Sequence, residues 1–126
     1  ERALSANASV RSAWVETTVA AVQRAHMDGV VFDWEAPCPV GSPLQYYYTL
    51  LISETRQALM KISPSYQITT CVAWSPDDID GRGYNMTAFA EATDLLFVMD
   101  YDTRSQVATT PVRTRFLRKL KAGLAL

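Results

Sequence analysis

Apolar and polar positions along the chain change their period several times, and each change predicts a different element. From Ser9 to about His26, apolar side chains recur every three or four positions, which is the spacing of one helix face. Asn7 and Ser9 are both suitable N-caps for this helix. We interpret His26 as a residue packed near the helix C-terminus rather than as a ligand.

A short apolar run over Val30–Glu35 follows, and it predicts a strand that is covered on both faces at its start. After a loop over 36–43 that is rich in proline, Ser42 and Pro43 favour the start of a second helix, which we expect to end at Ser63-Pro64-Ser65. The expected apolar face of this helix consists of Leu44, Tyr47, Tyr48, Leu51, Ile52, Leu59 and Ile62.

The remaining pattern predicts a strand over Tyr66–Trp74, a polar loop to Gly83, a short helix over about Tyr84–Thr93 and a strand over Leu95–Tyr101. The order is therefore helix, strand, helix, strand, helix, strand. Such regular alternation predicts an α/β fold with a parallel sheet and right-handed crossovers. Functional groups in such folds gather at the carboxyl ends of the strands.

Carboxylates stand at two of these strand ends, Asp33 and Glu35 at the first and Asp100 and Asp102 at the third. Because side chains alternate along a strand, Asp33 and Glu35 face one side and Trp34 faces the other. Unpaired charge on a buried face is costly, so the arrangement favours a functional site. An acidic strand end wetted by solvent is the alternative.

Composition narrows the class of protein. The chain has 126 residues and 48% hydrophobic content, enough for about one domain with a packed core. Residues 1–106 hold 7 basic and 13 acidic side chains, whereas residues 107–126 hold 5 basic side chains and no acidic one. The acidic body argues against a nucleic-acid partner, and no apolar run reaches membrane-spanning length.

The sequence also lacks the spacing of familiar metal sites. Cys38 and Cys71 are the two cysteines and His26 is the single histidine, so a zinc site is not expected, and whether the cysteines pair stays open. The acidic loop 77–81 does not fit an EF-hand, because Pro76 and Thr87 would occupy the first and twelfth positions. We interpret this loop as solvated, and we expect no metal and no cofactor.

Three segments resemble the family-18 glycoside hydrolases, the chitinases and their relatives. DGVVFDWE, residues 28–35, resembles the DxxDxDxE signature on the fourth strand of the family's TIM barrel. FVMDYD, residues 97–102, is similar to the sixth-strand M-x-Y-D element, and VAWSPDDIDGRGYN, residues 72–85, resembles chitobiase-type members. The resemblance implies a partial TIM (β/α)8 barrel, about strands 4 to 6 with their helices. Residues 1–106 would form this partial catalytic barrel, and residues 107–126 a basic tail outside it.

The resemblance also implies an activity, the cleavage of β-1,4-linked N-acetylglucosamine by substrate-assisted retaining catalysis. Glu35 matches the general acid, Asp33 the residue that holds the substrate's 2-acetamido group, and Tyr101 the hydroxyl that positions that group. The expected substrate-binding residues are Asp102, Met99 and Trp74, although packing inside the barrel would equally explain the tryptophan. The expected partner is an N-acetylglucosamine oligosaccharide, such as a chitobiose core or chitin oligomer, with neither nucleic acid nor a membrane involved.

Two departures from the family pattern limit this expectation. Val31 replaces the second aspartate of the signature, so Asp33 loses a hydrogen-bonding neighbour. The chain is also shorter than the roughly 250 residues of a TIM barrel, so we expect it to aggregate or stay partly folded and to hydrolyse little by itself. A chitinase-like protein that binds the same sugars without cleaving them is the alternative. The resemblance and two sequons, at Asn7 and Asn85, suit a lysosomal or secreted glycoprotein.

Overall fold

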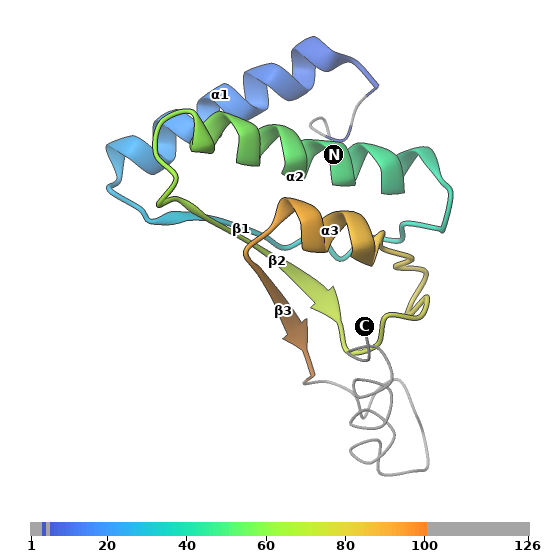
Figure 1. Cartoon of the computed structure of the whole chain (residues 1–126). Helices are drawn as coiled ribbons and strands as arrows, with labels where there is room; N and C mark the ends of the chain where they lie inside the picture. The colour runs from blue at the N-terminus through green and yellow to red at the C-terminus, as the bar shows by residue number, and fades with distance from the viewer. Residues whose placement is uncertain (1–3, 5, 101–126) are drawn as a thin grey trace.

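The computed structural model describes residue 4 and residues 6–100, in which helices and strands alternate as predicted (Figure 1). The elements are α1 (Ala8–Arg24), β1 (Gly29–Phe32), α2 (Pro43–Met60), β2 (Gln67–Ala73), α3 (Met86–Ala92) and β3 (Leu95–Met99). Among the described helices, none is both long and apolar enough to cross a membrane.

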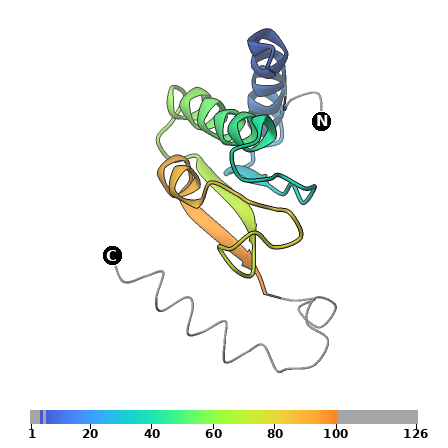
Figure 2. The ribbon, with the colours of Figure 1, turned by 90° about the vertical axis from the view of Figure 1, so that its right-hand side faces the viewer.

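The three strands form one parallel sheet in the order β1-β2-β3, which confirms the predicted α/β class. Phe32 of β1 lies opposite Thr70 of β2, and Ala73 of β2 lies opposite Met99 of β3. The described helices all lie on one face of this sheet, as Figures 1 and 2 show. The carboxyl ends of the strands therefore meet at a single edge, where we expected the functional groups.

Polar residues start each of the three helices. The side chain of Asn7 accepts a hydrogen bond from the amide of Ser9 at the start of α1, so Asn7 is the cap of the two candidates. Ser42 caps α2 with Pro43 as its first residue, as predicted. Asn85 accepts from the amide of Ala88 and caps α3. Both sequon asparagines thus have a structural role as N-caps.

Tyr48 is the centre of the core between α2 and the sheet. Its side chain is 2% exposed, and its ring contacts those of Phe32, Trp34, Tyr84 and Phe89. Burial raises the pKa of Tyr48 to about 12, so the hydroxyl stays neutral as a hydrogen-bonding group. The interpretation of this tyrosine as a core residue is confirmed.

Several details differ from the sequence prediction. β1 ends at Phe32 rather than Glu35, because beyond it the carbonyl of Trp34 accepts from the Tyr84 hydroxyl instead of joining the ladder. His26 is exposed with a φ of 52°, so the expected packing of this residue is wrong: α1 ends at Arg24 and the chain turns away. Ile62 is 45% exposed because it lies beyond the end of α2.

The sheet face opposite the helices carries large apolar side chains that remain accessible. Val31 on β1 and Leu95 and Phe97 on β3 are 65%, 54% and 52% exposed. Their positions alternate with those of Phe32 and Val98, which pack in or against the core on the helix side. In a closed (β/α)8 barrel this face would point to the interior.

Candidate active site

Asp33 and Glu35 follow β1 directly, at the edge where the strands end. Phe32 and Trp34 place their rings 6.4 Å and 5.1 Å from the ring of Tyr48, so both face α2. The alternation of side chains therefore continues past the last ladder bond, and the two carboxylates face the opposite side of the sheet. Both are exposed in the described part of the chain.

A buried thiol, that of Cys71 on β2, lies beside these carboxylates. Since Thr70 is opposite Phe32, the next residue along β2 is level with Asp33. Burial raises the pKa of Cys71, and the charge of Asp33, a side-chain hydrogen bond with Asp33 and the charge of Glu35 raise it further. Cys71 and Cys38 are both buried free thiols, which answers the question of whether they pair.

Glu35 also has a cationic partner that the sequence did not reveal. Nη1 of Arg82 lies 3.1 Å from Oε2 of Glu35, and Nη2 of the same guanidinium lies 3.0 Å from Oδ2 of Asp80. Asp80 belongs to the acidic loop that we interpreted as solvated. Its side chain is indeed 53% exposed, but its carboxylate also forms an ion pair with Arg82. The Asp80-Gly81 pair before Arg82, a frequent turn signal, was the available clue.

The structure describes two of the other four expected site residues, Met99 and Trp74. Met99 is buried at the end of β3, and since Val98 packs against the core, Met99 faces the same side as the carboxylates. Trp74 follows β2 and is half-buried. Tyr101 and Asp102 lie outside the described residues. The structure thus brings Asp33, Glu35, Trp74 and Met99 to one sheet edge, and their roles stay predictions.

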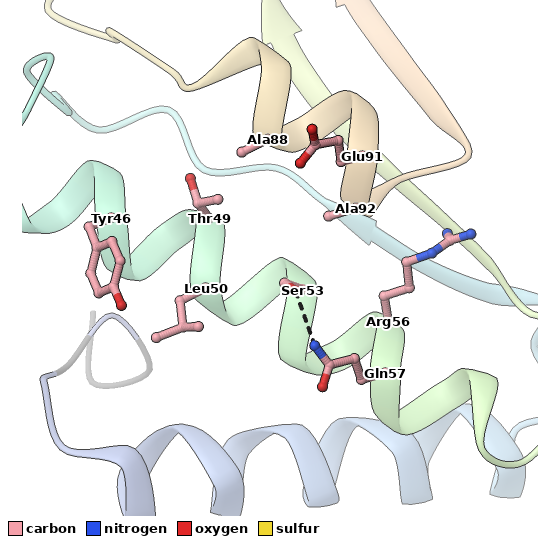
Figure 3. A pocket seen from close by; sticks show the side chains of 9 residues that line it. All are labelled: Tyr46, Thr49, Leu50, Ser53, Arg56, Gln57, Ala88, Glu91 and Ala92. Atoms are coloured by element: carbon pink, nitrogen blue, oxygen red, sulfur yellow. Dashed lines mark hydrogen bonds between the residues drawn. The ribbon is translucent and has the colours of Figure 1, made fainter.

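Two grooves in the described part of the chain differ in their relation to this edge. One, of about 270 Å³, is lined by residues of α1, β1 and α2, and Asp33 is part of its wall. The other, of about 290 Å³, lies between α2 and α3, with Tyr46, Ser53 and Glu91 in its lining (Figure 3). No residue of the candidate site lines the second groove, so we assign it no part in the chemistry of Asp33 and Glu35.

A parallel sheet with its helices on one face and carboxylates at its strand ends is the arrangement of a segment of a (β/α)8 barrel. The family model of the glycosyl hydrolases family 18 matches residues 2–121, and the chain belongs to this family. The match continues past residue 106, where we expect the partial barrel to end, and that boundary stays a prediction.

Curated relatives and solved structures agree with this family. The chain is 41% identical over 101 residues to di-N-acetylchitobiase of Rattus norvegicus and 42% identical over 101 residues to probable di-N-acetylchitobiase 2 of Dictyostelium discoideum. These alignments cover 80% of this chain but 28% and 26% of the relatives, so the chain spans about a quarter of their length.

The fold is also similar to that of a family-18 chitinase from Cycas revoluta, solved in complex with (GlcNAc)3. The TM-score is 0.70 at 24% identity, over 80% of this chain and 31% of the chitinase. At this level the likeness shows the fold alone. It identifies the three strands as part of a TIM barrel, as the sequence predicted.

Proposed function

We propose that this chain is the catalytic segment of a glycosidase that cleaves β-1,4-linked N-acetylglucosamine. The observation that carries the proposal is the position of Asp33 and Glu35. Both lie on the sheet face opposite the helices, at the carboxyl end of a strand in a family-18 protein. The names of the relatives, di-N-acetylchitobiase, favour short N-acetylglucosamine oligosaccharides as substrates. Exo and endo cleavage are both compatible with this proposal.

In the proposed reaction the substrate supplies its own nucleophile. Glu35 donates a proton to the glycosidic oxygen while the oxygen of the 2-acetamido group attacks the anomeric carbon, so that the glycosidic bond breaks and an oxazolinium forms. Asp33 holds the acetamide N–H, and Tyr101 directs the acetamide oxygen, as the sequence resemblance implies. Water, deprotonated by Glu35, then opens the oxazolinium and restores the configuration. Asp102, Met99 and Trp74 would contact the sugar.

A binding protein is the second candidate, and Val31 favours it. The valine lies on the same face as Asp33, is 65% exposed and has no group that could hydrogen-bond the carboxylate. Cys71 is the neighbour that does so. If the thiol does not replace the missing partner, Asp33 could still hold an acetamide group without supporting turnover.

Hydrolysis and binding measured on one protein separate the two candidates. We suggest a complete chimeric barrel in which residues 8–100 of this chain replace the matching segment of the rat di-N-acetylchitobiase. We expect release of N-acetylglucosamine from chitotriose, and we expect the Glu35→Gln variant to lose at least about 100-fold of the rate, the usual contribution of a general acid. Calorimetric binding of chitotriose without any turnover by the unsubstituted barrel would instead establish the binding protein.

We also propose a lysosomal or secreted location with glycans at the sequons. Asn7 and Asn85 are both exposed, as the acceptor asparagines of N-linked glycans are. Expression in mammalian cells, followed by treatment with a peptide N-glycosidase, should reveal a mass loss. A protein whose mass does not change on this treatment would carry no N-linked glycan at either sequon, and the proposal would be wrong.

A further inference from the structure

Arg82 combines a permanent charge with burial, and this needs an explanation. Its side chain is 8% exposed, while the two carboxylates that it contacts, Glu35 and Asp80, are 58% and 53% exposed. A buried guanidinium is stable only where its donors meet acceptors. Here Nη1 and Nη2 each meet a different carboxylate, and Nε donates to the carbonyl of Ile79 at 3.4 Å.

A tight turn fixes the base of this side chain. Arg82 donates its backbone N–H to the carbonyl of Ile79 at 2.9 Å, and the two residues between them have φ angles of 55° (Asp80) and 71° (Gly81). Positive φ at both central positions is the signature of a type I′ turn. The guanidinium therefore projects from a rigid turn, and its carboxylate partner Asp80 belongs to the same turn.

The segment that contains this turn is joined to the segment that carries Glu35. The Tyr84 hydroxyl donates to the carbonyl of Trp34, the residue before Glu35. The amide of Cys38 donates to the carbonyl of Gly81 at 2.6 Å. Arg82 is thus flanked by two hydrogen bonds between the segments, which reach the chain on either side of Glu35. Few surface ion pairs have such a fixed geometry.

We infer that Arg82 is a positioning residue for Glu35, and that it orients the carboxyl group so that Oε1 presents the proton to the glycosidic oxygen. The inference rests on the proposed function, in which Glu35 is the general acid. The contact engages Oε2, so the other oxygen is directed to the substrate. Asp80 pairs with the other terminal nitrogen of the same guanidinium, so Arg82 is held from both sides.

The dependence on the leaving group distinguishes positioning of an acid from a general structural role. A sugar hydroxyl needs protonation as it leaves, whereas 4-nitrophenolate leaves with little assistance. In the chimeric barrel, we expect Arg82→Gln to lower kcat on chitotriose by about 10- to 100-fold and on 4-nitrophenyl chitobioside by less than about threefold. Arg82→Lys, which keeps the charge, should recover part of the loss on chitotriose.

The matched control is Arg56→Gln, because Arg56 forms a similar ion pair with Asp94 away from the strand ends. This variant should leave both rates unchanged. Equal losses on the two substrates for Arg82→Gln, or no recovery in Arg82→Lys, would overturn the positioning role while leaving the proposed function intact. An unsubstituted barrel without turnover on either substrate would overturn the proposed function, and the positioning role with it.

Discussion

The hydroxyl group of Tyr48 lies 3.2 Å from Oγ1 of Thr70, and this contact joins α2 to the central strand of the sheet. Oγ1 of Thr70 donates in turn to the carbonyl of Phe32 at 3.3 Å, so the chain of hydrogen bonds reaches β1, the strand that leads into Asp33 and Glu35. Tyr48 and Thr70 are both buried. The position of the candidate site therefore depends on this small polar network inside the core.

Removing the Tyr48 hydroxyl tests that dependence. We expect Tyr48→Phe to lower the free energy of unfolding by about 1 kcal/mol, since Thr70 keeps its acceptor on Phe32. Tyr48→Ala should cost about 3–5 kcal/mol because it also leaves a cavity among the aromatic rings. Urea unfolding followed by tyrosine and tryptophan fluorescence measures both. Tyr46→Phe, at a 62% exposed position, is the control and should change little.

Gly29 is a position where any side chain would collide with the neighbouring strand. A Cβ atom there would lie 1.8 Å from the carbonyl oxygen of Gln67, which is backbone and cannot move aside alone. Gly29→Ala should therefore destabilise the sheet by about 3 kcal/mol or more. Thermal unfolding followed by circular dichroism checks this.

Gly41 provides the comparison for that substitution. It has a φ of 74° but open space around the Cβ position, so Gly41→Ala should cost only about 1 kcal/mol of conformational strain. Similar melting temperatures for the two alanine variants would contradict the proposed clash at Gly29.

The carboxylate of Asp33 should be detectable through the thiol beside it. Negative charge disfavours the thiolate, so Asp33→Asn should lower the pKa of Cys71, while burial continues to raise it. In a Cys38→Ser background, the thiolate absorbance in the far ultraviolet should then appear at lower pH. Glu35→Gln should act in the same direction but more weakly, because Glu35 is the smallest of the causes. A shift to higher pH in Asp33→Asn would contradict the contact.

Acid should weaken the connection between α2 and β2 through Asp94. Hydrogen bonds from Arg56 and from the amide of Ile68 lower the pKa of Asp94 below its ordinary value of 3.8. The folded state thus binds the proton less readily than the unfolded chain, so this stabilisation is complete above pH 3.8 and is lost as the pH falls below it. Asp94→Asn should show a smaller loss of melting temperature between about pH 6 and about pH 3. Asp78→Asn is the exposed control.

The sheet face opposite the helices carries exposed apolar side chains, and we therefore expect the isolated chain to self-associate. Phe97, at 52% exposure, lies with Leu95 on the last described strand and would be covered in a closed barrel. We expect Phe97→Lys to raise the soluble, monomeric fraction of the chain several-fold, as measured by size-exclusion chromatography. Tyr46→Lys, on an outer helix, should not. An equal gain from both variants would point to net charge rather than to this face.

Much of the fold was predictable because local rules determine it. Capping preferences predict the start of α2 at Ser42 and Pro43. Periodicity predicts the alternating order of strands and helices, and the rules of chain connection predict the parallel sheet. The end of β1 was not predictable, since it depends on the Tyr84 hydroxyl, far along the chain, meeting the carbonyl of Trp34. His26 was misplaced for the opposite reason: the helical period continued in the sequence after the helix had ended at Arg24.

The sequence by itself indicated the residues that we propose for the chemistry, because Asp33, Glu35 and the family pattern occur together in one short segment. It also determined that both carboxylates share a face, since alternation along an extended chain is a local property. Only the tertiary structure decided what surrounds them. Cys71 comes from the next strand and Arg82 from the loop after it, and their contacts with Asp33 and Glu35 exist because parallel strands bring distant segments to one edge.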